Sequence, residues 1–404
     1  MIERATTFAV MMAASLQLTV AHAQDYEIPP VFSADTVLTE SLLSGSNHRV
    51  DDRVQNDGFL NHYVIQSLFG ELDVASTALL RKRVHEMNVI AELEAVSETE
   101  LFANAVTSKV EDLVAGAESI VTDPIGSVEN VVSGVGKLFG RATRRLSETA
   151  RSDAEDSQFE DLIGFSKAKR DYAYEFGVDV YSRNQLLQRR LNAVAWTGYT
   201  AGLSGSIALG AVSGGVGIAI TATSATQLMD QVVRDSSPDD LRLLNRERLA
   251  DMGVHESVIE LFIGNALFTP REQTEIVAAL DEMAGVESRE RFITHAVLTD
   301  TADVARFRAQ QARMYADYHA NHTPLSGFVS VGELLFGITA EGGLIANTPV
   351  DYLSWTASLE AIVDAADQAI AGAVAYKELR VTGHLSDRAK QALTQRGWEF
   401  VEGA

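Results

Sequence analysis

Apolar residues recur at helical spacing over most of the chain, and prolines are rare. Only seven prolines interrupt 404 residues, which leaves long tracts rich in alanine, leucine, glutamate and arginine that favour helix. Between residues 59 and 96 the apolar positions keep a spacing of three and four, which predicts a helix with a break near Gly70. The same reasoning predicts further helices at 98–121, 154–176, 184–196, 238–252, 255–266, 270–284, 288–299 and 302–320.

Three of the prolines share a pattern that marks the start of a helix. In each case a hydroxyl residue precedes the proline, and a carboxylate follows the proline two residues later. The hydroxyl can accept a hydrogen bond from a free amide of the first turn, and proline has no N–H to lose there. The third case predicts a long helix from Pro349 to Tyr376. The three are Ser237-Pro238-Asp239-Asp240, Thr269-Pro270-Arg271-Glu272 and Thr348-Pro349-Val350-Asp351, and Ser97-Glu98-Thr99-Glu100 is a fourth capping box.

Strand signals are confined to two short regions. Residues 328–346 are rich in β-branched residues and contain an Ala-Glu-Gly-Gly turn, which predicts a β-hairpin. Residues 378–382 and 398–401 flank a helix that starts near Ser386, which predicts a small strand–helix–strand unit, and residues 24–58 indicate an irregular, partly helical lead-in. The expected fold class is therefore mainly α. It consists of multi-helix, bundle-like lobes around a buried glycine-rich apolar segment, with minor β near 328–346 and 378–401.

The segment from Asn192 to Met229 contains no charged residue and carries seven glycines. So long an apolar run must be shielded from water by the protein itself, by a bilayer or by a partner. We favour a buried core hairpin of small-residue helices, because glycines four residues apart let two backbones approach closely. Insertion of residues 203–223 into a membrane is the alternative, although their glycines, serines and threonines make insertion marginal; a surface for a partner's helix is a third interpretation. The candidate helix-contact or membrane-contact residues are Gly198, Gly202, Gly210 and Gly214.

The first 23 residues have the three parts of a signal peptide. Arg4 supplies a short positive region, Phe8 to Val20 form an apolar stretch, and a small-residue cleavage site ends at Ala23. Cleavage after Ala23 would place the mature chain in the periplasm or outside a bacterial cell. The expected organisation is a signal peptide (1–23), an N-terminal helical region (24–185), the glycine-rich apolar segment (186–232) and a C-terminal helical domain with small β elements (233–404).

Charge and cysteine content narrow the functional classes. The formal net charge of −23 argues against nucleic acid as a partner and gives net repulsion from anionic lipid. The sequence contains no cysteine, which excludes disulfides, a thiolate zinc site and a cysteine nucleophile. An unknown protein partner fits this composition, and membrane contact is a less favoured alternative.

No catalytic or cofactor motif is complete in the sequence. Ser213 lies in an Ala-Val-Ser-Gly-Gly run that lacks the first glycine of a serine nucleophile elbow. Gly136-Lys137 lacks the remaining residues of a phosphate loop, and His85-Glu86 has no second histidine at metalloprotease spacing. We therefore predict no cofactor, and the sequence does not identify catalytic residues.

The best candidate for a metal site is the stretch Asp317–His322. His319 and His322 stand about one helical turn apart and could share a cation, with His295 or Glu333 completing the set in three dimensions. The simpler interpretation is that both histidines interact with the helix dipole near a C-terminus. We therefore assign no metal site.

Three functional hypotheses follow. The first is a non-enzymatic structural or interaction protein that a bacterial cell exports, which the extensive helical surface and the lack of a catalytic motif support. The second is a membrane-active protein that inserts residues 203–223. The third is a hydrolase or metal-dependent enzyme whose site is assembled from distant residues near His319 and His322. Whether the chain is an enzyme stays open.

Overall fold

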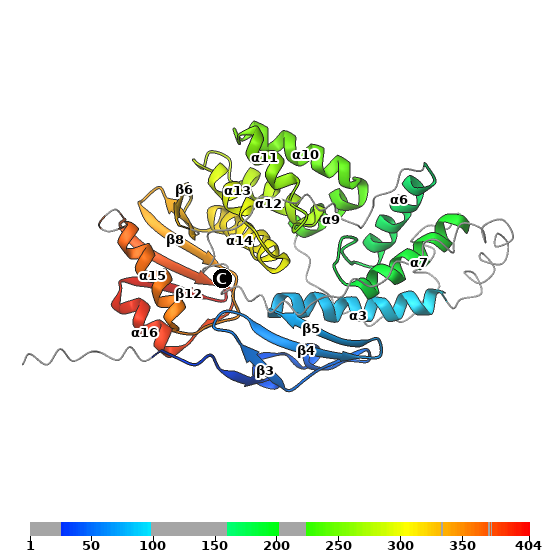
Figure 1. The fold of residues 1–404 in the computed structure, drawn as a ribbon, viewed down its shortest axis with the longest axis horizontal. Coiled ribbons are helices and arrows are strands. Elements are labelled where there is room, and N and C mark those ends of the chain that lie inside the picture. Colours follow the sequence, from blue (N-terminus) through cyan, green and yellow to red (C-terminus); the bar gives the residue numbers. More distant parts are fainter. Residues whose placement is uncertain (1–25, 98–159, 202–223, 333, 371, 373) are drawn as a thin grey trace, which may run out of the picture.

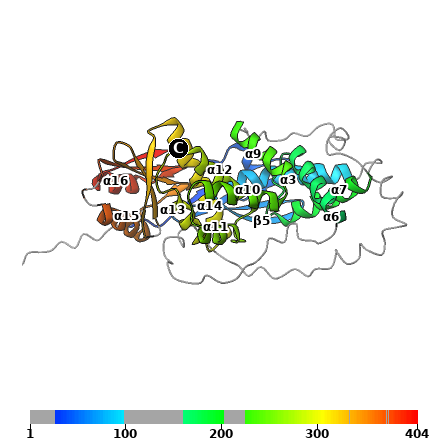
Figure 2. The ribbon, with the colours of Figure 1, turned by 90° about the horizontal axis from the view of Figure 1, so that it is seen from above.

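The computed structural model describes residues 26–97, 160–201 and 224–404, apart from positions 333, 371 and 373. These residues form an N-terminal sheet, a set of helices and a C-terminal sheet with its own helices (Figure 1). The described part of the molecule is elongated (Figure 2). Near one end lie α15 (Ala357–Ile370) and α16 (Asp387–Gln395), and near the other lie α6 (Glu160–Glu175) and α7 (Gln185–Ala201).

The expectation of a mainly α fold is wrong. The described residues are 54% helix and 21% strand, and they form three sheets, one of them a half-barrel. The largest difference lies in residues 26–75, where a partly helical lead-in and a helix are expected and five strands form instead. Tyr63 and Ile65 are buried at alternate positions of one strand, so a period of two governs this segment. The spacing of Leu60, Val64 and Leu68 imitates a helix by coincidence.

The N-terminal sheet is antiparallel throughout and is organised around its longest strand, β4. β5 pairs with almost the whole of β4, β3 and β2 pair with the two ends of β4, and β1 extends the sheet from β3. Tyr63, Ile65 and Val74 are buried in the core of this sheet. The elements are β1 (Val31–Ser33), α1 (Ala34–Val37), α2 (Glu40–Leu43), β2 (His48–Val50), β3 (Arg53–Asn56), β4 (Asn61–Ser67) and β5 (Gly70–Ala75).

Helix α3 (Thr77–Ser97) belongs to two cores at once. Leu80 and Val84, in its first half, pack on the N-terminal sheet. Ile90 and Leu93, in its second half, pack in a core with residues of α6 and α7. Helix α9 (Ser224–Asp235) packs against α6 and completes this helical lobe. Helix α3 thus connects the N-terminal sheet to the helical lobe.

The short helices expected in the second half of the chain are confirmed. The hydroxyls of Ser237 and Thr269 each accept a hydrogen bond from the amide three residues on, and the carboxylates of Asp240 and Glu272 accept from the cap amides in return. Both starts are therefore full capping boxes followed by proline. The helices are α10 (Pro238–Asp251), α11 (Glu256–Ile263), α12 (Pro270–Glu282), α13 (Glu290–Val297) and α14 (Ala302–Asn321).

The C-terminal sheet has the strand order β12-β10-β8-β7-β6. β6, β7 and β8 are antiparallel neighbours, and β10 and β12 continue the sheet parallel to β8. The predicted hairpin is β7–β8 and the predicted strand–helix–strand unit is β10–α16–β12, but both belong to this larger sheet. The strands are β6 (Leu325–Val331), β7 (Leu334–Thr339), β8 (Gly343–Thr348), β10 (Tyr376–Val381) and β12 (Trp398–Glu402), and β9 (Tyr352–Leu353) pairs with β11 (His384–Leu385) in a separate small sheet.

Helices cover both faces of the C-terminal sheet. Alternate residues of β8 belong to different cores, as the pleat of a strand requires. Ile345 packs in the core that α11 to α14 form, whereas Leu344 and Ala346 pack in the core that α15 and α16 form. The sheet is therefore the middle of three layers, and Phe307 of α14 reaches past it to pack in the core that α15 and α16 form.

The helix expected from Pro349 does not form, and α15 begins only at Ala357. Asp351, expected in the first turn of that helix, instead accepts hydrogen bonds from the backbone amides of Asn61 and Thr77, each at 3.0 Å. Thr77 is the first residue of α3, so Asp351 caps a helix that starts 274 residues before it. Burial raises the pKa of Asp351. This carboxylate ties the C-terminal domain to the N-terminal sheet.

Most of the glycine-rich segment falls outside the described residues. Gly202, Gly210 and Gly214 fall there, and so does the membrane candidate 203–223. Gly198 lies on α7, and the hydroxyl of Tyr172 on α6 occupies the space that a side chain at position 198 would take. Among the helices in the described ranges, none is both long enough and apolar enough to cross a membrane.

Candidate binding pocket

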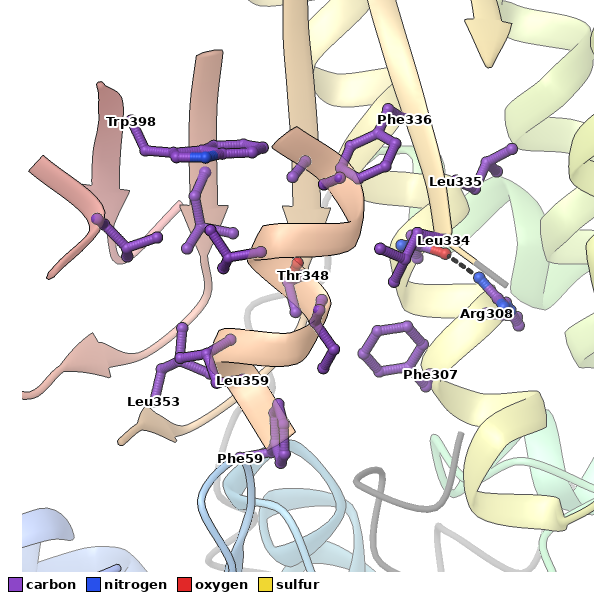
Figure 3. Close-up of a pocket in the computed structure, with 17 residues that line it drawn as sticks. Phe59, Phe307, Arg308, Leu334, Leu335, Phe336, Thr348, Leu353, Leu359 and Trp398 are labelled. Atoms are coloured by element: carbon purple, nitrogen blue, oxygen red, sulfur yellow. Dashed lines mark hydrogen bonds between the residues drawn. The ribbon is translucent and has the colours of Figure 1, made fainter. Parts of the chain in front are cut away.

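A cavity of about 80 Å³ lies between the C-terminal sheet and helix α15 (Figure 3). Its walls come from segments that are far apart in the sequence, so it exists only in the folded chain. The lining residues are Phe59, Phe307, Arg308, Gln311, Leu334, Leu335, Phe336, Ala346, Thr348, Leu353, Leu359, Ile362, Val363, Ala366, Leu379, Leu393 and Trp398.

The helix and the sheet present facing surfaces to the cavity. On α15, Leu359, Ile362 and Ala366 recur at intervals of three and four residues, so they form one stripe along the helix. On β8, Ala346 and Thr348 are alternate residues and therefore line the cavity from the same face of the sheet. The periodicities of helix and strand together place these side chains around one space.

Small side chains on both walls leave the space open. Ala346 on β8 and Ala366 on α15 are buried and line the cavity from opposite sides. Protein interiors are otherwise packed with few voids larger than a water molecule. An engineered cavity of about 150 Å³ lined by leucine, isoleucine and phenylalanine binds benzene. The present cavity therefore has room for a branched alkyl group or part of a ring.

The lining of the cavity is partly exposed to solvent at three residues. Leu334, Thr348 and Ile362 are half-buried, whereas side chains deeper in the cavity such as Phe336 and Val363 are buried. The lining is thus least covered at the start of β7, the end of β8 and the middle of α15.

Polar groups from α14 lie at one margin of the cavity. Nη1 of Arg308 donates a hydrogen bond to Oε1 of Gln311 at 2.8 Å, and Nε2 of Gln311 donates to the backbone oxygen of Asn347 at 2.8 Å. These bonds hold both side chains against β8. Apart from these two residues and Thr348 the lining is apolar, so the cavity favours an apolar group and offers few polar contacts.

The two histidines considered for metal binding have other contacts in the structure. Nδ1 of His319 accepts a hydrogen bond from the amide of Leu325 at 3.0 Å. The ring of His322 stacks on Tyr318 with a centroid distance of 5.3 Å, and Nη2 of Arg380 donates to its Nε2 at 3.2 Å. Both side chains therefore stabilise the end of α14 and the turn that follows it.

The described residues that could complete a metal site have other partners as well. Nε2 of His295 lies 2.9 Å from the hydroxyl of Ser330, and Asp317 accepts a hydrogen bond from the amide side chain of Asn321. Glu333 lies outside the described residues. Within the described ranges, no three histidine or carboxylate side chains are placed so that they could hold a metal ion.

Charged side chains, buried or half-buried, gather where α3 and the 177–184 loop meet α9 and α12. Nζ of Lys82 lies 2.7 Å from Oδ2 of Asp179. Burial raises the pKa of Asp179, but attraction to Lys82 and Arg271 outweighs this effect and lowers the pKa to about 2. Arg271 also pairs with Glu275 at 2.9 Å and with Asp230 at 2.7 Å. Because each charge has an opposite partner, we assign this network to the docking of helices and not to ligand binding.

No family model, no curated protein and no solved structure matches this chain. Its function must therefore be inferred from its own geometry. No local motif marks the cavity, because its lining runs from Phe59 to Trp398 and consists of residue types that any core contains. The spacing of Leu359, Ile362 and Ala366 is the one local signal, and it indicates only that a helix buries this face.

Proposed function

We propose that this chain is an exported interaction protein that binds a partner protein by taking one apolar side chain into the cavity beneath α15. The observation that carries this proposal is the cavity, about 80 Å³ of space with an apolar lining, polar groups at one margin and an opening to solvent. Pockets that receive a single apolar anchor are typical of the energetically important centre of protein–protein interfaces. Sites for whole substrates or cofactors are several times larger.

Such an anchor would make a modest contribution to the affinity of the complex. Burying one leucine-sized side chain stabilises a complex by about 1.5–3 kcal/mol, which corresponds to roughly 10- to 100-fold in affinity. The anchor alone therefore binds weakly, and contacts around the opening must supply the remainder. The net charge of −23 favours a partner that surrounds its apolar anchor with basic residues. Export is part of the same proposal and depends on residues 1–23, which lie outside the described residues.

Titration with amino-acid amides tests the proposal. The full chain, labelled at alanine and leucine methyl groups, is titrated with N-acetyl-leucinamide and, in parallel, with N-acetyl-glycinamide. We expect saturable NMR shifts at Ala346 and Leu359 with the leucine compound, with a dissociation constant on the order of 10 mM, and none with the glycine compound. Hexanoate is the third arm: binding of hexanoate without binding of N-acetyl-leucinamide would indicate a lipid-like ligand and overturn the protein-partner proposal.

Two alanine-to-leucine variants provide a matched comparison. Ala346 lines the cavity, whereas Ala309 on α14 is buried in the core on the other face of the sheet. Ala346→Leu should abolish binding of N-acetyl-leucinamide, because the new side chain fills the cavity. Ala309→Leu should lower the free energy of unfolding by about 1–3 kcal/mol through overpacking and keep the binding. Binding that survives in Ala346→Leu would place the ligand elsewhere and contradict the proposal.

A further inference from the structure

Phe59 belongs to the N-terminal sheet but lines the cavity of the C-terminal domain. It lies in the turn between β3 and β4 and is only 3% exposed. In Figure 3 its ring stands at one end of the lining, far from Trp398 and Phe336 at the other end. The N-terminal sheet thus closes one end of a cavity whose other named walls are built by the second half of the chain.

Hydrogen bonds within the turn fix the position of Phe59. Oδ1 of Asp57 accepts from the amide of Phe59 at 2.9 Å and from the amide of Leu60 at 2.7 Å. Oδ2 of the same carboxylate lies 3.0 Å from Nε2 of His62. Gly58 has a φ of +101°, a conformation that glycine adopts readily and other residues rarely do. The turn therefore has one well-defined shape.

Further backbone hydrogen bonds attach this turn to the C-terminal domain. The carbonyl oxygen of Phe59 accepts from the amides of Asp351 at 2.9 Å and Tyr352 at 3.2 Å. The carbonyl oxygen of Gly58 accepts from the amide of Ser354 at 3.1 Å. The turn is therefore held by hydrogen bonds within itself and by hydrogen bonds to the C-terminal domain. Phe59 is for this reason a fixed wall of the cavity and not a mobile lid.

From this geometry we infer that Phe59 determines the length of the apolar group that the cavity accepts. The inference rests on the proposed binding function and deepens it, because it names the residue that limits the size of the anchor. A group bound against the half-buried Leu334 and Ile362 can extend along the cavity until it meets the ring of Phe59. The N-terminal sheet therefore selects the ligand of a pocket that the C-terminal domain builds.

A series of straight-chain alcohols from propanol to octanol measures this length limit on the full chain. In the wild type, affinity should rise about fourfold for each added CH₂ group and then level off where the chain meets Phe59. In Phe59→Ala the rise should continue over more carbons. We expect octanol to bind Phe59→Ala at least about tenfold more tightly than the wild type, while the affinity for propanol changes by less than about twofold.

Leu60→Ala is the matched control, because Leu60 is buried in the same turn and the same core but does not line the cavity. An unchanged length limit in Phe59→Ala overturns the inference, and so does an equal extension in Leu60→Ala, which would show that loosening of the turn is the cause. Phe59→Leu gives the same comparison with a smaller change if the alanine variant does not fold. If no alcohol binds the wild type, the proposed function itself fails; if alcohols bind without a length limit, only the role of Phe59 fails.

Discussion

Acid should remove a calculable part of the stability of this protein through Asp179. Its side chain is 6% exposed, and its carboxylate lies 2.7 Å from Nζ of Lys82. Burial alone raises the pKa of Asp179, but Lys82 and Arg271 lower it from an ordinary 3.8 to about 2. Because the pKa is lower in the folded state than in the unfolded state, the unfolded chain binds the proton first as the pH falls. The stabilisation is therefore complete above about pH 4–5 and is lost toward pH 2.

The size of this effect follows from the two pKa values. Lowering the pKa of Asp179 from 3.8 to about 2 stabilises the fold by about 2 kcal/mol when the carboxyl group is ionised. Proton linkage leaves nearly all of this stabilisation at pH 5 and only a small part of it at pH 2. The difference in unfolding free energy between the wild type and Asp179→Asn should therefore shrink by about 2 kcal/mol over this range.

Urea unfolding of both proteins at pH 5, 4, 3 and 2 measures that difference. Other carboxyl groups titrate in the same range, but they are common to both proteins and cancel in the comparison. Asp171→Asn is a suitable control, because its pair with Lys167 lies on the surface and should contribute about 0–1 kcal/mol. A difference between wild type and Asp179→Asn that stays constant from pH 5 to pH 2 would refute the reasoning.

Three further substitutions test single contacts. Asp351→Ala removes the acceptor for the amide of Thr77 and should lower the free energy of unfolding, measured in urea, by about 2–3 kcal/mol. A free energy of unfolding equal to that of the wild type within error would contradict the role of Asp351 as a cap of α3. Gly198→Val would collide with Tyr172, so its unfolding free energy should fall by about 1–3 kcal/mol, and an unchanged midpoint would contradict the close helix contact. Thr269→Ala removes half of a capping box, so the free energy of unfolding, measured by circular dichroism in urea, should fall by about 1 kcal/mol.

Elements whose determinants lie close together in the sequence could be predicted. The cap bonds at Ser237 and Thr269 join residues only three apart, so neighbouring residues are enough to identify the helix starts. The same pattern at Thr348-Pro349 fails because its carboxylate, on Asp351, bonds to Thr77 across 274 residues. Local chemistry is the same in all three cases, and only the tertiary partner decides the outcome.

The N-terminal sheet shows a second limit of sequence patterns. Leu60, Val64 and Leu68 are four residues apart and fit a helix, although Tyr63 and Ile65 alternate as a strand requires. A strand gains its hydrogen bonds from neighbouring strands, so its stability depends on residues that a single window does not contain. The pairing of β4 with β5, β3 and β2 therefore decides the conformation.

Sequence patterns could not predict the cavity, for a related reason. Ala346 and Ala366 leave space only because a sheet and a helix place them opposite each other, and Phe59 closes one end only because the N-terminal turn is bonded to Asp351 and Tyr352. An alanine or a phenylalanine in isolation indicates neither a void nor a wall. The site is a consequence of tertiary packing and not of any motif.

The position of bound N-acetyl-leucinamide would decide most directly whether the cavity receives an apolar anchor. Nuclear Overhauser effects between the ligand and the labelled methyl groups of the full chain give that position. We predict contacts from the leucine methyl groups of the ligand to Ala346 and to Leu359, which line the cavity. Contacts confined to surface leucines such as Leu243 or Leu298, which are 56% and 63% exposed, would show that the cavity is not the binding site.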